Sequence, residues 1–169
     1  ADKDGGRPAI DAAERELCKY DLFYLLAFVC GRVDVRVSDF LFERCQEVQE
    51  SPDGHLDLWS REHYKSTILT YAKTIQDILC DPTITVGIFS HTKPIARGFL
   101  RQIKYELETN ERLKQLFPEI LYPNPKTDAP AMGNSWSEDK GITVKRDCND
   151  KDSTVEAHGL VDGQPPGNH

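Results

Sequence analysis

The chain has 169 residues, of which 38% are hydrophobic and 29% are charged, and its formal net charge is −7. This composition allows a folded core and excludes a disordered polyelectrolyte. The acidic balance argues against a wholly basic nucleic-acid coat protein but leaves room for a local basic patch. The longest apolar run, Leu22 to Cys30, is far shorter than the ~20 residues of a membrane span. Five cysteines without motif spacing favour a reducing cytoplasm.

Helical periodicity dominates the first third of the chain. Residues 1–10 are expected to form a flexible tail. From Asp11, apolar residues recur at helical spacing until Gly31, which is a plausible stop. Ser38 is a suitable N-cap for a second helix that ends near Gln49. Residues 11–52 are therefore expected to form an N-terminal helical segment.

Strands and helices alternate in the rest of the chain, and residues 118–135, which hold four prolines, are expected to form a loop. This order predicts an α/β fold with a helical preface. Because the chain stops in a turn after a strand, we expect an incomplete domain. The predicted strands are 55–59, 83–89, 142–146 and 153–161, and the predicted helices are 65–80, 110–117 and one that begins near residue 93.

Lys65, Ser66 and Thr67 lie where the first predicted strand meets a predicted helix. A phosphate-binding loop occupies such a junction, with its Lys on the terminal phosphates and the next hydroxyl on Mg²⁺. The standard spacing of that loop requires glycines at the positions of Trp59 and Tyr64. A non-glycine residue held at positive φ costs ~1–3 kcal/mol. The alternative is an ordinary helix start whose lysine faces solvent.

A basic stripe runs along the predicted helix that begins near residue 93, and no acidic residue lies between 91 and 105. Spacings of four, four and three residues place the cations on one face. Such a face can contact a nucleic-acid backbone, or it can simply be solvated. The stripe consists of Lys93, Arg97, Arg101 and Lys104.

Three stretches together resemble the large subunit of a tailed-bacteriophage or prophage terminase, the ATP-driven DNA-packaging motor. Residues 59–67 are similar to the variant Walker A loop of that family, commonly Arg-Gly-His-Gly-Lys-Ser-Thr. Residues 88–118 resemble the segment that follows this loop. Residues 141–146 and 153–163 resemble the strands that precede the Walker B motif. The three stretches occur in the order and at the spacing of the family.

The resemblance implies a P-loop NTPase-type, mostly parallel sheet flanked by helices over residues 53–169, truncated before the Walker B strand. It implies an ATPase that couples ATP hydrolysis to translocation of DNA into a capsid. Lys65 would bind the β- and γ-phosphates, Ser66 the Mg²⁺, and Thr67 would support them. Arg61 would sense or stabilise the γ-phosphate, so Arg61 and Lys65 are the implied catalytic residues. The implied ATP contacts are Arg61, Glu62, His63, Tyr64, Lys65, Ser66 and Thr67.

The loop departs from the family pattern at Glu62 and Tyr64, which replace two glycines. The resemblance further implies double-stranded DNA, a terminase small subunit and a portal protein as partners, a homo-oligomeric ring, and a place in the host bacterial cytoplasm without a membrane. Because the Walker B residues and the endonuclease domain would lie beyond His169, we expect weak or no ATP turnover from this chain alone. Two alternatives stay open, namely a helicase-like P-loop ATPase and a non-catalytic module that has lost the glycines.

Overall fold

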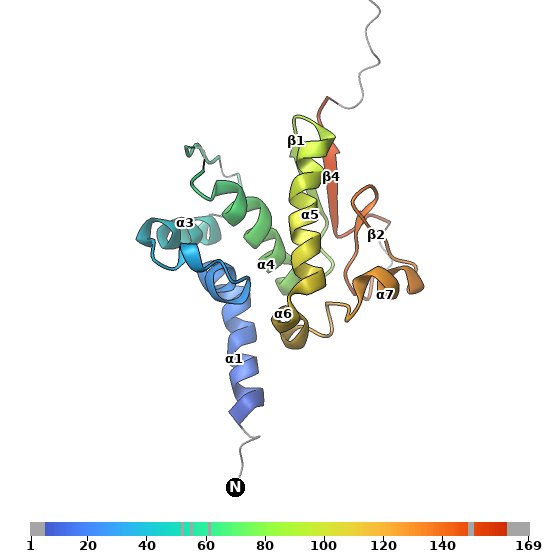
Figure 1. Ribbon diagram of the computed structural model, residues 1–169, viewed down its shortest axis with the longest axis horizontal. Helices are drawn as coiled ribbons and strands as arrows, with labels where there is room; N and C mark the ends of the chain where they lie inside the picture. The colour runs from blue at the N-terminus through green and yellow to red at the C-terminus, as the bar shows by residue number, and fades with distance from the viewer. Residues whose placement is uncertain (1–5, 52, 55, 61, 149–150, 162–169) are drawn as a thin grey trace, which may run out of the picture. The chain divides into compact units, whose positions relative to one another are not determined.

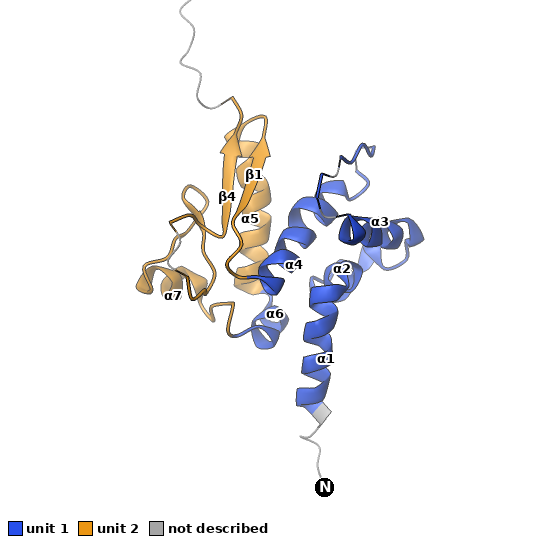
Figure 2. Ribbon diagram, turned by 180° about the vertical axis from the view of Figure 1, so that it is seen from behind, with its two compact units in different colours: residues 1–81, 110–118 blue, residues 82–109, 119–169 orange. Residues whose placement is uncertain are grey.

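A computed structural model of the chain describes residues 6–51, 53–54, 56–60, 62–148 and 151–161 (Figure 1). The chain divides into two compact units (Figure 2). Unit 1 comprises residues 1–81 and 110–118, and unit 2 comprises residues 82–109 and 119–169. The sequence suggested a boundary near residue 53, whereas the structure places the Lys65 region in the same unit as the N-terminal helices.

The described part of unit 1 is built from helices. Asp21 interrupts the first predicted helix because it is extended and its side chain accepts a hydrogen bond of 2.8 Å from the Tyr24 N–H, as an N-cap does. Ser38 caps α3 as predicted, accepting from the Leu41 N–H at 3.3 Å. The helices are α1 (Gly6–Tyr20), α2 (Leu22–Tyr24), η1 (Leu25–Val29), η2 (Val33–Val35), α3 (Asp39–Glu50), η3 (Thr67–Ala72), α4 (Lys73–Cys80) and α6 (Glu111–Leu116).

Two predictions for unit 1 are wrong. Residues 6–10, expected in a tail, are helical because α1 begins at Gly6. The described residues of the predicted strand 55–59 form no strand, and Leu56 and Leu58 are 80% and 84% exposed. Alternation of apolar and polar residues favours a strand only where a neighbouring strand completes the hydrogen bonds and a core covers the apolar side. The structure provides neither for this segment.

Unit 2 contains a four-stranded mixed sheet in the order β1-β4-β3-β2. Strand β1 (Val86–Ser90) pairs in parallel with β4 (Val155–Gly159). Strand β3 (Gly141–Ile142) pairs antiparallel with both β4 and β2 (Trp136–Ser137). The α/β class is therefore confirmed, but the expectation of a mostly parallel sheet is wrong, because one of these three pairings is parallel. The short segment 136–142 returns as a hairpin rather than through a crossover helix.

Helix α5 (Lys93–Thr109) begins where the sequence predicts a helix and packs on β1 and β4. Its core-facing residues are fully buried, namely Ala96, Leu100, Ile103 and Leu107. Within the predicted loop 118–135 the structure contains α7 (Pro125–Ala131). Pro125 at the first helical turn explains this helix, since proline there lacks only an N–H that would be unpaired anyway.

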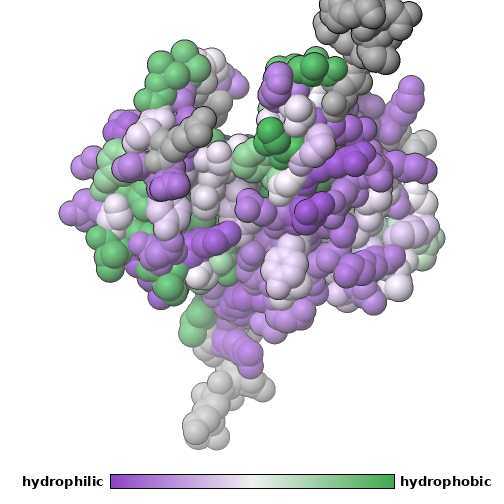
Figure 3. All heavy atoms as spheres, turned by 45° about the horizontal axis from the view of Figure 1, so that its top comes forward, coloured by the Kyte–Doolittle hydropathy of each residue, from purple (hydrophilic) through white to green (hydrophobic). Residues whose placement is uncertain are grey.

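The surface visible in Figure 3 mixes hydrophilic and hydrophobic residues, and the hydrophobic ones form separate small patches. No helix among the described residues is long and apolar enough to cross a membrane. All five cysteines lie within the described ranges and are free thiols.

Candidate phosphate-binding loop

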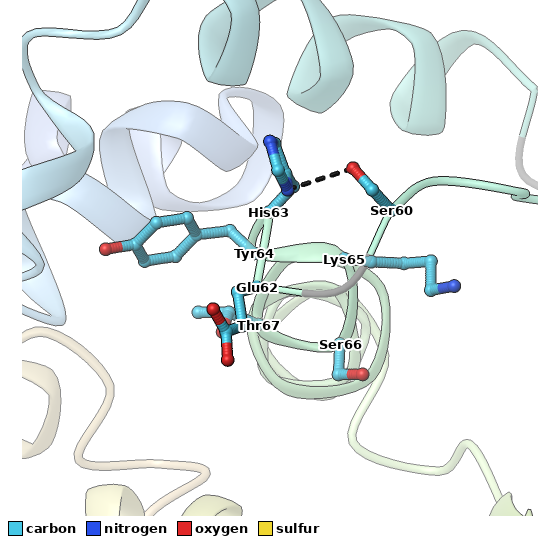
Figure 4. Close-up of a pocket in the computed structure, with 7 residues that line it drawn as sticks. All are labelled: Ser60, Glu62, His63, Tyr64, Lys65, Ser66 and Thr67. Carbon is cyan, nitrogen blue, oxygen red and sulfur yellow. Dashed lines mark hydrogen bonds between the residues drawn. The ribbon is translucent and has the colours of Figure 1, made fainter.

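The loop that precedes Lys65 forms a shallow cavity in unit 1 (Figure 4). The chain turns at residues 62–64 and becomes helical at Lys65, where the Ile68 N–H donates to the Tyr64 carbonyl at 2.9 Å. The cavity measures about 290 Å³. Its lining consists of residues that the sequence had singled out, together with Ser60: Ser60, Glu62, His63, Tyr64, Lys65, Ser66 and Thr67.

Two loop residues have a left-handed backbone conformation, with φ of 67° at Glu62 and 60° at Tyr64. They are the only non-glycine residues with positive φ in the described ranges. They also occupy the two positions at which the terminase resemblance places glycines. Side chains disfavour this conformation because Cβ crowds the backbone. The loop thus adopts the backbone path of a glycine-containing turn although it lacks the glycines. Turns with left-handed residues can direct successive N–H groups into an anion-binding concavity.

Side-chain hydrogen bonds hold the turn at both ends. The Ser60 Oγ and the His63 Nδ1 lie 3.0 Å apart (Figure 4). The Tyr64 hydroxyl donates to Asp34 Oδ2, which belongs to η2. This bond lowers the pKa of the Asp34 carboxyl and raises the pKa of the Tyr64 phenol from their ordinary values. Both shifts follow from a hydrogen bond that favours the carboxylate and the neutral phenol.

The charged side chains of the loop extend in different directions. In Figure 4 the Lys65 ammonium and the Ser66 hydroxyl lie on one side of the helix start. The Glu62 carboxylate extends to the opposite side, next to Thr67. An ammonium group and a hydroxyl beside a helix start are a suitable donor set for a magnesium-bound phosphate. Glu62 also lines the cavity, but its carboxylate extends away from this donor set, so Lys65 and Ser66 fit such a group.

Most of the predicted ATP contacts line this cavity, while Arg61 lies outside the described residues. The described residues 56–60 before the loop form no strand, so an irregular segment, rather than a sheet strand, precedes the loop there. After Lys65 and Ser66 the helix continues as η3, a π-helical stretch with Ile68 and Tyr71 buried. Isolated π-helical turns occur frequently at functional sites.

The basic stripe lies in unit 2 on α5, and Arg97, Arg101 and Lys104 each pair with an acid. Arg97 pairs with Asp139, and Arg101 pairs with Glu138 through Nη2 and Oε2 at 2.8 Å. The guanidinium lowers the pKa of the Glu138 carboxyl. Glu138 and Asp139 therefore compensate the positive charge of Arg101 and Arg97, which the sequence had suggested as a contact for a nucleic acid.

Lys104, the last cation of the stripe, lies 2.7 Å from Glu108, and this carboxylate also accepts from Trp136 Nε1 at 2.9 Å. Lys126 Nζ lies 3.3 Å from the same side chain. Burial alone would raise the pKa of Glu108, but the hydrogen bonds from Lys104 and Trp136 hold it below its ordinary value. Glu108 thus connects α5 to β2 and α7.

Sequence reasoning missed the acids that contact the singled-out residues. Asp34 precedes Tyr64 by 30 positions, and Glu138 follows Arg101 by 37. No short-range spacing links such residues, because the turns between them decide their proximity. Only the i,i+4 pair of Lys104 and Glu108 carries a local signal.

Comparisons of this chain with protein-family models, with curated proteins and with solved structures gave no match.

Proposed function

We propose that the chain is the ATP-binding part of a DNA-packaging ATPase of the terminase large-subunit type, and that its phosphate site is the loop at residues 60–67. The observation that carries the proposal is the positive φ of both Glu62 and Tyr64. A loop that accepts this cost at two positions of one turn, on either side of His63, has a use for the conformation, since strained backbone is concentrated at functional sites.

The proposed chemistry assigns one role to each donor. Lys65 supplies the positive charge for the terminal phosphates of ATP, and the Ser66 hydroxyl is the protein ligand of Mg²⁺. Thr67 supports the first helical turn. Arg61, outside the described residues, is proposed to contact the γ-phosphate, where arginines assist other NTPases. Magnesium supplies neutralisation of the phosphate charge when it is bound.

DNA translocation by a ring of copies, with a small subunit and a portal as partners, belongs to the same proposal and rests on the resemblance. The pairing of Arg97 and Arg101 with Asp139 and Glu138 weakens the case for direct DNA contact by α5. We therefore assign the nucleotide site to this chain ahead of any DNA contact.

A second candidate is a non-catalytic module that has kept the loop but lost nucleotide binding. The absence of a strand at residues 56–60 favours it, because a sheet strand normally anchors the start of a phosphate loop. Under this alternative, neither ATP nor pyrophosphate binds the loop.

The decisive experiment is calorimetric titration of the whole chain with Mg²⁺-ATP, with Lys65→Ala and a matched Lys151→Ala control. We expect binding that Lys65→Ala weakens at least about tenfold, because a charge-assisted contact is lost. Lys151 is exposed in unit 2, so its substitution should leave the affinity unchanged. Equal affinities of all three proteins would exclude the proposed site, and no binding by any of them would favour the non-catalytic module.

A further inference from the structure

Tyr64 combines a left-handed backbone with a side chain that reaches out of its own loop. Its φ is 60°, and its hydroxyl donates to Asp34, 30 positions earlier in the chain. In Figure 4 the Tyr64 ring points away from the side on which the Lys65 ammonium lies. The ring therefore lines the cavity away from the Lys65 ammonium, while its hydroxyl is bound to Asp34.

Asp34 is exposed, but it belongs to a short segment that contacts two neighbouring helical elements. Its neighbour Val35 is fully buried. The Arg36 Nε donates to the Ala27 carbonyl at 2.9 Å, which joins η2 to η1. The Arg32 guanidinium lies 5.4 Å from the centre of the Tyr71 ring in η3, the helix that continues from the loop. The segment 32–36 thus contacts both the loop and the helix behind it.

We propose that Asp34 is a positioning residue for the phosphate loop: its hydrogen bond to Tyr64 holds residue 64 in the left-handed conformation that a glycine would otherwise supply. This inference rests on the function proposed above. A glycine at residue 64 would need no anchor, whereas a tyrosine has other backbone conformations of lower energy. The Asp34 carboxylate on η2 accepts from the Tyr64 hydroxyl when residue 64 is left-handed, and this hydrogen bond therefore favours that conformation over the others.

Simple electrostatics and the positioning role predict opposite results for loss of Asp34. Asp34 is negative, so removing it should strengthen the binding of an anion if charge alone mattered. If Asp34 positions the loop, its removal lowers the population of the binding-competent conformation, and the apparent affinity falls in proportion. The direction of the change therefore separates the two roles.

The test is Mg²⁺-ATP titration of single and double variants of the whole chain. We expect Asp34→Ala and Tyr64→Phe each to weaken binding about two- to tenfold, and the double variant to be no weaker than either. Asp34→Asn should retain most of the affinity, since an amide oxygen also accepts from a phenol. Tyr64→Gly should bind at least as well as the original chain, and adding Asp34→Ala to it should change nothing. Glu43→Ala, at an exposed acid of α3, is the charge-matched control.

Two measurements without nucleotide keep this inference separate from the proposed function. Asp34→Ala should speed amide hydrogen exchange in the peptide 60–68, and it should lower the pKa of the Tyr64 phenol, seen as the difference between titrations with and without Tyr64→Phe. Unchanged exchange and phenol titration would overturn the positioning role. So would an Asp34→Ala effect of equal size in the Tyr64→Gly background. If no variant binds ATP but exchange and titration change as expected, the positioning role stands and the nucleotide site fails.

Discussion

Glu62 is the residue of the loop whose identity opposes the proposed function most directly. It combines a φ of 67° with a negative charge on the cavity lining. Tyr64 has an anchor in Asp34, whereas the Glu62 carboxylate lies beside Thr67 (Figure 4). At the residue scale, a side-chain hydrogen bond therefore connects one left-handed position to η2, and the other carries a negative charge on the cavity lining.

We expect Glu62→Gly to strengthen Mg²⁺-ATP binding about three- to tenfold. Glycine adopts positive φ without steric cost, so more of the free protein has the binding conformation. Titration calorimetry of Glu62→Gly and Glu62→Ala checks this, because alanine removes the charge but keeps Cβ. Equal gains from both substitutions would mean that charge, and not backbone conformation, limits binding.

The elements of unit 1 depend on caps that the sequence makes visible. Ser38 accepts from the Leu41 N–H at the start of α3. Replacing an N-cap serine with alanine typically costs ~1 kcal/mol. We expect Ser38→Ala to lower the free energy of unfolding by about that amount, measured by urea titration. Ser38→Asp should retain the stability, since aspartate is an equally good cap. An equal loss of unfolding free energy in Ser38→Ala and Ser38→Asp would contradict the capping role.

The connection between α5, β2 and α7 depends on the ionised form of Glu108. Because its folded-state pKa lies below the ordinary value of 4.5, its stabilisation is present above that value and is lost as the pH falls through the folded-state pKa. We expect Glu108→Gln to reduce the free energy of unfolding at neutral pH. Below about pH 4.5, the free energy of unfolding of this variant should fall less steeply with decreasing pH than that of the original chain.

Urea unfolding at several pH values, followed by Trp136 fluorescence in a Trp59→Phe background, measures this effect in unit 2. Trp136 is a suitable probe because its Nε1 donates to Glu108. If stability fell as steeply with decreasing pH in Glu108→Gln as in the original chain, other carboxylates would be responsible for the loss of stability in acid.

At the scale of the whole molecule, the charge of the chain bears on the proposed binding of DNA. The net charge is −7, and the acids at 138 and 139 pair with Arg101 and Arg97. We expect weak binding to double-stranded DNA, and stronger binding with a steeper salt dependence in Glu138→Gln/Asp139→Asn, because phosphates can then replace the carboxylates. Glu16→Gln/Glu43→Gln changes the net charge equally at exposed residues of unit 1. DNA affinity is measured by fluorescence anisotropy. An equal gain in affinity in both double variants would show that net charge, and not the pairing of the α5 arginines, limits DNA binding.

Local patterns in the sequence predicted the long helices well. The N-cap at Ser38 and the start of α5 near residue 93 depend on residues close together in the chain, so the sequence alone specifies them. The same reasoning placed the candidate loop at the start of the helix 65–80, where the structure has it. It failed at residues 56–59, because a strand depends on neighbours far away in the sequence.

The sequence by itself therefore determined the α/β class, most of the helices and, apart from Ser60, the described residues that line the candidate site, since each depends on short-range periodicity or on a compact motif. The tertiary structure alone decided that the sheet is mixed, that α5 is charge-compensated, and that Asp34 reaches Tyr64. It also placed Glu62 and Tyr64 in the positive-φ conformation that glycine adopts most readily. These features join residues separated by many turns of chain, and their energies depend on which surfaces pack together.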